Sequence, residues 1–249
     1  MDAKPMTSKD QSTNIRFTPG WWGLVIALGI LVIWAVVLFF LLSRPLTAFT
    51  WWLIPAILLQ THLYTGIFIT AHDAMHGTVA PLRWLNDGVG WVAATLFAFN
   101  YWPRLYRNHH RHHRHVGTAD DPDVHQGPFW KWYIFFLKQY ITWPQVVLMA
   151  LTYNGLSLLF QQVNVALFWM IPALLSTLQL FYFGTYLPHK GSFPKANRHH
   201  SDSLRKNHLW AFLSCYFFGY HYEHHELPHV PWWQLHRVKG TLSVPLKES

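Results

Sequence analysis

Long apolar blocks without charge constrain this chain more than any other feature of its sequence. Residues 21–43 contain no charged side chain, and residues 51–71 contain none except for His62, should it be protonated. A helix needs about 20 apolar residues to cross the hydrocarbon core of a bilayer. Only 12% of the chain is charged, about half the share in a typical soluble domain. The sequence therefore predicts an integral membrane protein.

Two further blocks complete the predicted set of spans. Residues 143–160 form a shorter candidate, and residues 165–187 form a fourth, which Pro172 is expected to kink. The predicted fold class is therefore all-α, with four transmembrane helices in two hairpins and a cytoplasmic helical cap. Residues 1–19 are predicted to be a flexible cytoplasmic tail, and residues 20–249 a single membrane-embedded domain.

Two other apolar stretches, 88–102 and 209–220, are too short to span easily and are interpreted as re-entrant or surface segments. The single cysteine, Cys215, excludes an internal disulfide and gives no sign of an oxidising compartment.

The distribution of positive charge predicts the orientation. The 44–50 loop carries only Arg44, and the 161–164 loop carries no charge. Every other Lys and Arg lies in the tail, in 72–142, or after 187. Because Lys and Arg collect in cytoplasmic loops, both termini are expected on the cytoplasmic side. The net charge of +8 is explained in the same way and does not require nucleic acid.

The 18 histidines are the chemical signature of the chain, and most lie in short clusters. Helical positions i, i+3 and i+4 share one face, so each cluster is expected to present its imidazoles together. Imidazole binds Zn, Cu, Fe and Ni, and eight or nine of them fit two metal ions better than one. All clusters fall on the predicted cytoplasmic side. The predicted ligands are His72, His76, His109, His112, His113, His189, His221, His224 and His225.

Other interpretations of these clusters remain open. The run 109–115 could be a basic low-complexity tract that touches lipid phosphates. His72-Asp73-Ala74-Met75-His76 imitates the zinc protease motif, with Asp in place of Glu. A carboxylate-bridged di-iron site would use paired Glu-x-x-His motifs, but only Glu226 and His229 match, with Pro228 between them. Metal transport would need polar groups along the spans, where only His62 lies well inside.

Several segments give the chain a family resemblance. They are 68–77 around the first histidine pair, 117–123 (Gly-Thr-Ala-Asp-Asp-Pro-Asp), 181–190, and 218–226 followed by Pro231-Trp232-Trp233. The histidine boxes resemble those of the membrane fatty-acid desaturase superfamily, and the segments between them resemble bacterial β-carotene ketolases. Ala119 departs from the family pattern, which leads us to expect an acidic residue there.

The resemblance implies an activity, cofactors and partners. We expect a non-haem di-iron oxygenase that uses O2 to convert the C4 methylene of the β-ionone ring to a ketone by two hydroxylations and a dehydration. β-Carotene would give echinenone and canthaxanthin, and zeaxanthin would give astaxanthin. No flavin or dinucleotide fingerprint is visible, so electrons are expected from a ferredoxin-type donor. The expected location is the bacterial inner membrane, with the metal site on the cytoplasmic side.

The nearest alternatives are a lipid hydroxylase or fatty-acyl desaturase with the same site, and then a zinc-dependent intramembrane protease. Beyond the ligands, certain acids are candidates for hydrogen bonds that orient imidazoles: Asp73, Asp121, Asp123, Glu223 and Glu226. Aromatic residues beside the histidines are candidates for a substrate tunnel: Phe181, Tyr182, Phe183, Tyr216, Phe217 and Phe218.

Overall fold

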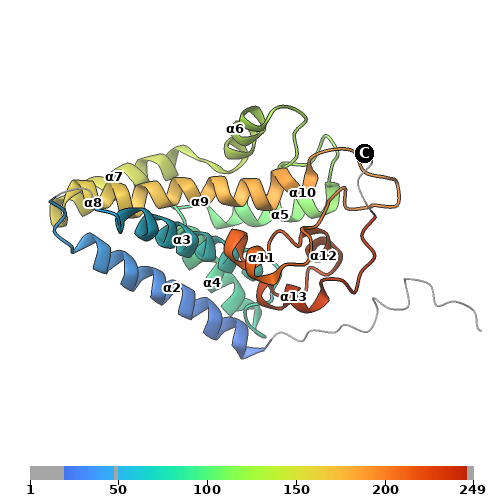
Figure 1. Cartoon of the computed structure of the whole chain (residues 1–249), viewed down its shortest axis with the longest axis horizontal. Coiled ribbons are helices and arrows are strands. Elements are labelled where there is room, and N and C mark those ends of the chain that lie inside the picture. The colour runs from blue at the N-terminus through green and yellow to red at the C-terminus, as the bar shows by residue number, and fades with distance from the viewer. Residues whose placement is uncertain (1–19, 48–49, 246–249) are drawn as a thin grey trace, which may run out of the picture.

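The computed structural model describes residues 20–47 and 50–245, and all regular structure in those ranges is helical (Figure 1). The all-α prediction is confirmed for this part of the chain. The predicted tail, 1–19, lies outside the described residues.

Three helical stretches are long and apolar enough to cross a membrane. The first two are α2 (Trp21–Leu42) and α3 (Leu53–Met75). The third is a continuous stretch, Gln162–His189, which is made of α8 (Gln162–Val165), η1 (Ala166–Met170), α9 (Ile171–Phe181), η2 (Tyr182–Tyr186) and α10 (Leu187–His189). Helix α3 is central, because it packs against α2, against α9 and against α4 (Arg83–Leu96).

The third long stretch contains two prolines, and each follows a π-helical segment. Pro172 follows the π-helical segment η1, and Pro188 follows η2. Proline has no N–H to donate to the preceding turn and its ring crowds that turn, and a wider π turn is one of the usual ways a helix absorbs such a disruption. A π turn therefore precedes each proline, and the stretch continues as one candidate span.

A bent helix pair stands where the third span was predicted. Helix α6 (Phe129–Tyr140) and helix α7 (Trp143–Leu159) meet at 91°, and the chain has four spans only if this pair counts as one. Helix α7 has 17 residues, or about 26 Å at 1.5 Å per residue. Because that length is marginal for a bilayer, the number of spans is three or four.

The long helices carry apolar side chains on their outer surfaces. Val32, Val36 and Phe39 on α2 are exposed, as are Leu151 and Leu158 on α7. Exposed apolar patches of this extent mark contact with lipid or with another protein. Together with the length of the helices, they identify a membrane protein.

The shorter helices gather at one end of the molecule, where α2 begins and α3 ends (Figure 1). They are α5 (Trp102–His115), α11 (His208–Cys215), α12 (His221–Glu226), η3 (Trp232–Gln234) and α13 (Leu235–Val238). The predicted surface segment 88–102 is the end of α4 followed by a tight turn, in which Ala98 and Phe99 have positive φ. The segment 209–220 likewise contains α11 and a turn through Tyr216 and Phe217.

At the opposite end, the connection between α2 and α3 is tied to the turn between α7 and α8. The side-chain amide of Asn164 donates a hydrogen bond to the carbonyl of Arg44 at 2.6 Å. The side-chain oxygen of Gln161 accepts one from the backbone N–H of Leu46 at 2.8 Å. The two hairpin turns therefore lie together, at the end of the molecule away from α11, α12 and α13 (Figure 1).

Candidate metal centre

Helices α3 and α5 bring two pairs of histidines together. His72 lies in the last turn of α3 and His76 caps its C-terminus, so their side chains lie one turn apart on one face. His109 and His113 have the same spacing on α5. The chain enters α5 through Tyr101, the N-cap residue, whose backbone is extended.

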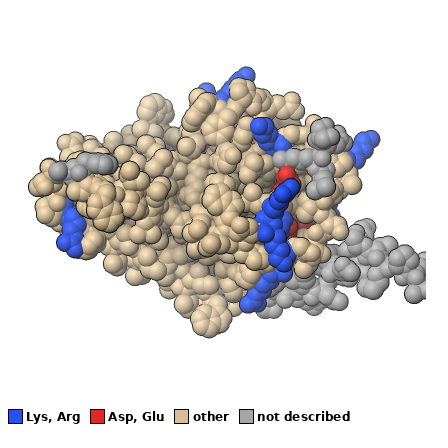
Figure 2. All heavy atoms as spheres, in the orientation of Figure 1, with Lys and Arg blue, Asp and Glu red and all other residues tan. Residues whose placement is uncertain are grey.

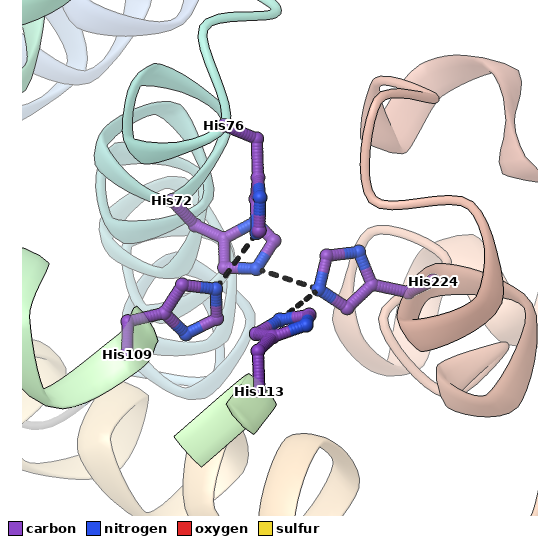
Figure 3. A group of neighbouring side chains, drawn as sticks. All are labelled: His72, His76, His109, His113 and His224. Carbon is purple, nitrogen blue, oxygen red and sulfur yellow. Dashed lines mark hydrogen bonds between the residues drawn. The ribbon is translucent and has the colours of Figure 1, made fainter. Parts of the chain in front are cut away.

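The first group of histidines contains these two pairs and His224 from α12, as Figure 3 shows. The Nε2 atoms of His76 and His109 lie 2.7 Å apart. The Nε2 atom of His224 lies 3.2 Å from that of His72 and 3.0 Å from that of His113. One ring nitrogen from each of the five lies within 4.8 Å of the others.

The second group contains His112, His189, His221 and His225, and all four are buried. The Nε2 atom of His225 lies 3.1 Å from that of His112 and 3.0 Å from that of His221. The Nε2 atoms of His189 and His221 lie 2.9 Å apart. His189 reaches this group from α10, far along the chain from the third box.

The two H-x-x-H-H boxes are divided between the groups by their helical spacing. In α5, the i, i+4 pair His109 and His113 belongs to the first group, while His112 belongs to the second. In α12, the i, i+4 pair His221 and His225 belongs to the second group, while His224 crosses to the first. Each box therefore contributes to both groups, and the two groups share the same two helices.

The spacing of the nitrogens fits metal ions. With metal–nitrogen distances of about 2.0–2.1 Å, neighbouring nitrogens of one ion lie roughly 3.0–3.4 Å apart. The six shortest separations between ring nitrogens run from 2.7 to 3.2 Å. Four of them lie within that range, and the other two are slightly shorter. Both groups can accordingly hold a metal ion, and their donors are of the class that suits iron, zinc, copper and nickel.

Burial favours the neutral imidazoles that metal binding requires. Burial lowers the pKa of His109, His221 and His224 well below its ordinary value, because a charged ring loses its hydration there. For His112, burial acts in the same direction, but the carboxylates of Asp123 and Asp121 outweigh it and raise the pKa. Of these two acids, Asp121 is the one whose carboxylate also hydrogen-bonds to the His112 ring.

Two imidazole rings are held in place by a hydrogen bond from Nδ1, the ring nitrogen that does not face the other histidines. His112 donates from Nδ1 to Asp121 Oδ1 at 2.9 Å. His189 donates from Nδ1 to the backbone carbonyl of His200 at 2.8 Å. His72 Nδ1 lies 3.5 Å from Asp73 Oδ1, while that carboxylate accepts the backbone N–H of Trp232 at 3.1 Å. The carbonyl of His200 was missed in the sequence, since a backbone acceptor leaves no signal in a residue pattern.

The remaining acidic candidates make other contacts. Glu223 is fully buried and pairs with Lys239 at 2.9 Å. Glu226 pairs with Arg198 and with His199. Asp123 accepts a hydrogen bond from the hydroxyl of Tyr140. None of these three carboxylates hydrogen-bonds to a predicted ligand among the described residues, so their contacts do not support an orienting role.

The histidines that were not predicted as ligands stay outside both groups. His110 is half-buried and packs edge-on against Tyr106, 4.2 Å between ring centroids. His62 stacks on Tyr216 in the middle of α3. His199 lies against His225 at 5.6 Å between centroids, but its Nε2 is bonded to Glu226.

A cavity of about 420 Å³ adjoins both groups. Its wall includes His72 and His109 of the first group and His112 and His221 of the second. From there it extends between α6, α7 and α9, where side chains such as Met149 and Leu174 are apolar. Of the aromatic tunnel candidates, only Phe218 is part of this wall. The others were not distinguishable in the sequence, because any aromatic beside a histidine has the same local pattern.

The fold and the site together define the class of this protein. It is a helical membrane protein with a polyhistidine centre, made of two all-histidine groups beside an apolar cavity. The sequence model of the family "Fatty acid desaturase" matches residues 49–148 and 127–244. A β-carotene ketolase of Paracoccus sp. (strain PC1) is 39% identical over 96% of this chain and 97% of its own. The chain therefore belongs to the β-carotene ketolase family within the fatty acid desaturases.

Other relatives support the same assignment. A β-carotene ketolase of Paracoccus sp. (strain N81106) is 40% identical over 72% of this chain and 77% of its own. A zeaxanthin 4-ketolase of Chlamydomonas reinhardtii is 37% identical over 87% of this chain and 53% of its own. No solved structure matches the chain.

Proposed function

We propose that this protein is an O2-dependent β-carotene ketolase that converts the C4 methylene of the β-ionone ring to a ketone. The observation that carries the proposal is the apolar cavity whose wall includes histidines of both groups. An apolar cavity is suited to a hydrocarbon ring, and here the histidines bring it beside the two groups. The names of the relatives supply the substrate class.

The reaction requires two oxidations at one carbon. Each converts a C–H bond to C–OH and uses one O2, two electrons and two protons, with release of one water. The second oxidation gives a geminal diol, which loses water to become the ketone. Two irons, when bound by the nine histidines, would supply the activation of O2.

The protein's own residues have three tasks in this proposal. Apolar side chains along α7 and α9 exclude water from the cavity. Phe218 lies edge-on to His72, 4.7 Å between ring centroids, and forms part of the cavity wall beside the histidines. Asp121 orients His112 through Nδ1. A ligand set without carboxylates distinguishes this centre from the Glu-x-x-His type.

We further propose that the protein lies in the bacterial inner membrane with four spans, both termini and the histidine-bearing cap on the cytoplasmic side. In this arrangement residues 20–249 form one catalytic domain. Basic side chains gather over the end of the molecule that carries α10 to α13 (Figure 2), which agrees with a cytoplasmic location. The same basic surface suits an acidic, ferredoxin-type electron donor.

The extent of similarity favours ketolase over the alternatives. Ketolases match at 36–40% identity over 72–96% of this chain, whereas two fatty-acid and oleoyl-lipid desaturases match over only 40% and 30% of it. A zinc protease would leave seven of the nine histidines, all but His72 and His76, without a role.

The test is pigment analysis in cells that produce β-carotene. Expression of the protein should convert β-carotene to echinenone and canthaxanthin, and cells that also make zeaxanthin should yield astaxanthin. An unaltered pigment profile at confirmed expression, with an electron donor and iron supplied, would refute the assignment. Desaturated lipids instead of ketocarotenoids would indicate the nearest alternative.

A further inference from the structure

The wall of the cavity is almost wholly apolar, but it contains one carboxyl group that is not part of either histidine group. This is Asp123, which is buried and lines the cavity together with Tyr140. The Tyr140 hydroxyl donates a hydrogen bond to Asp123 Oδ1. A buried carboxyl in an apolar wall is costly unless it is hydrogen-bonded, so its presence there requires a reason.

The pair lies at the histidine end of the cavity. The same oxygen of Asp121 accepts hydrogen bonds from His112 Nδ1 and from the backbone N–H of Asp123, both at 2.9 Å. The backbone of Asp123 is also held by Trp132, whose indole N–H donates to its carbonyl at 2.7 Å. Asp123 is thus fixed beside an imidazole that itself borders the cavity.

The carboxyl has unused hydrogen-bonding capacity. Within the described ranges, Tyr140 is the only side chain that hydrogen-bonds to the Asp123 carboxyl, through Oδ1, and no hydrogen bond reaches its second oxygen, Oδ2. A carboxylate can accept several hydrogen bonds. A hydroxyl group that entered this end of the cavity could therefore donate to Asp123, which is the only carboxyl group among the described residues that line the cavity.

A ketolase needs such a partner between its two oxidations. The starting ring carries no polar atom at C4, whereas the first oxidation leaves an alcohol there. An alcohol in an apolar cavity without a hydrogen bond is disfavoured, so it would tend to leave before the second oxidation. An acceptor fixed beside the histidines would oppose that loss and would also restrict rotation of the ring.

We propose that Asp123 and Tyr140 form a retention site for the C4 hydroxyl of the half-oxidised ring, which keeps the same carbon at the centre for its second oxidation. This inference rests on the proposed ketolase function. The second oxidation consumes one O2, two electrons from the external donor and two protons, and the resulting diol releases water. The pair forms no covalent bond in either step.

The same helix offers a matched comparison. Tyr133 lies two turns before Tyr140 on α6 and lines the same cavity. Its hydroxyl is bonded to the Thr177 hydroxyl on α9 at 2.6 Å rather than to a carboxyl. Loss of the Tyr133 hydroxyl removes one side-chain hydrogen bond from the same helix. It leaves the hydrogen bond between Tyr140 and Asp123 intact.

The experiment compares Tyr140→Phe with Tyr133→Phe in β-carotene-producing cells, with protein and iron quantified in each. In Tyr140→Phe the Asp123 carboxyl loses the one side chain among the described residues that holds it at the cavity wall, so the C4 alcohol should be retained less well. We therefore expect ketone formation to fall more than β-carotene consumption and the ratio of C4 alcohol to ketone to rise severalfold. In Tyr133→Phe this ratio should stay at the value of the unaltered protein, whatever the total turnover. An unchanged ratio in Tyr140→Phe would overturn the proposal.

A binding measurement separates retention from structural damage. Purified full-length protein in detergent is titrated with β-carotene, C4-hydroxylated β-carotene and a 3-hydroxylated carotenoid, with pigment absorbance as the readout. Tyr140→Phe should lose affinity severalfold for the C4 alcohol and little for β-carotene. Equal losses for both, or a loss confined to the 3-hydroxylated pigment, would refute the C4 site. If the unaltered protein makes no ketone, the proposed function fails, while a C4-alcohol preference in this titration would still stand.

Discussion

His112 and Asp121 are joined by a hydrogen bond of 2.9 Å between Nδ1 and Oδ1, which leaves Nε2 of His112 facing Nε2 of His225 at 3.1 Å. The carboxylate thereby sets the tautomer and the direction of one imidazole of the second group. Partners of this kind are worth about 10–100-fold in metal affinity or activity in known metalloproteins.

Asp121→Asn should therefore lower iron affinity and ketone formation by roughly 10–100-fold, because an amide oxygen holds the ring less strongly than a carboxylate. Iron per chain, measured by mass spectrometry at graded iron supply, tests this directly. Asp120→Asn is the control: Asp120 is exposed and pairs with Arg111 at the surface. Equal iron content in both variants would argue against an orienting role for Asp121.

We expect about two irons per chain, bound by imidazole nitrogen with almost no carboxylate, because nine histidines form two separate groups. Metal quantification gives the stoichiometry, and Mössbauer spectroscopy gives the iron environment. Finding one zinc and no iron would contradict this prediction and revive the protease alternative.

Neighbouring histidines on α5 should behave differently. His113→Ala should abolish ketone formation and lower bound iron, since its Nε2 faces that of His224 at 3.0 Å. His110→Ala should retain most activity, because that ring packs on Tyr106 and belongs to neither group. Both variants must be compared at equal abundance in the membrane. If they lose iron equally, the ligand set is wrong.

The orientation can be tested by labelling single cysteines with a membrane-impermeant reagent. Thr47 and Gln162 are exposed at the end far from the histidines, and Lys206 is exposed between α10 and α11. Cysteine at position 47 or 162 should react only from the periplasmic side, and cysteine at 206 only from the cytoplasmic side. The native Cys215 is buried and provides the low background. Periplasmic labelling at 206 would reverse the proposed topology.

Gly184 leaves space for the ring of Phe218, so a larger residue there should affect activity through that ring. A Cβ at this position would lie 2.4 Å from the Phe218 ring, which itself contacts His72 and lines the cavity. Gly184→Ala should therefore displace Phe218 and reduce ketone formation at least about tenfold, since misplacement of about 1 Å can cost 10²-fold. Additional replacement of Phe218 by Leu should restore part of the activity. No loss in the single variant would show that the ring can move without consequence.

The histidine spacing predicted which residues gather, but not how they divide. Positions i, i+3 and i+4 share a face, which is why His109, His112 and His113 were expected together. The division of α5 and α12 between two groups depends on the angle at which the helices meet, and that angle is set by tertiary packing. His189 was expected from its location, and the structure brings it to the second group.

Other features could not be predicted, for identifiable reasons. The 91° bend between α6 and α7 arises at a break of two residues. A hydropathy value is averaged over a window much longer than two residues, so it does not reveal such a break. The role of Asp123 was interpreted as orienting a histidine because sequence shows only that an acid is near the boxes. The side chain that hydrogen-bonds to its carboxyl in the structure, Tyr140, lies 17 residues away on another element, and no local pattern connects the two.

The division of α12 between the two groups also determines when the centre can form during synthesis. Each group includes at least one residue from 221–225, which follow all the candidate spans along the chain, so neither group is complete while the earlier helices enter the membrane. The ion pair of Glu223 with Lys239 requires still later residues. Both sets of histidines therefore stay incomplete until residues 221–225 have been added, and a chain that stops before residue 221 reaches the membrane with both groups incomplete.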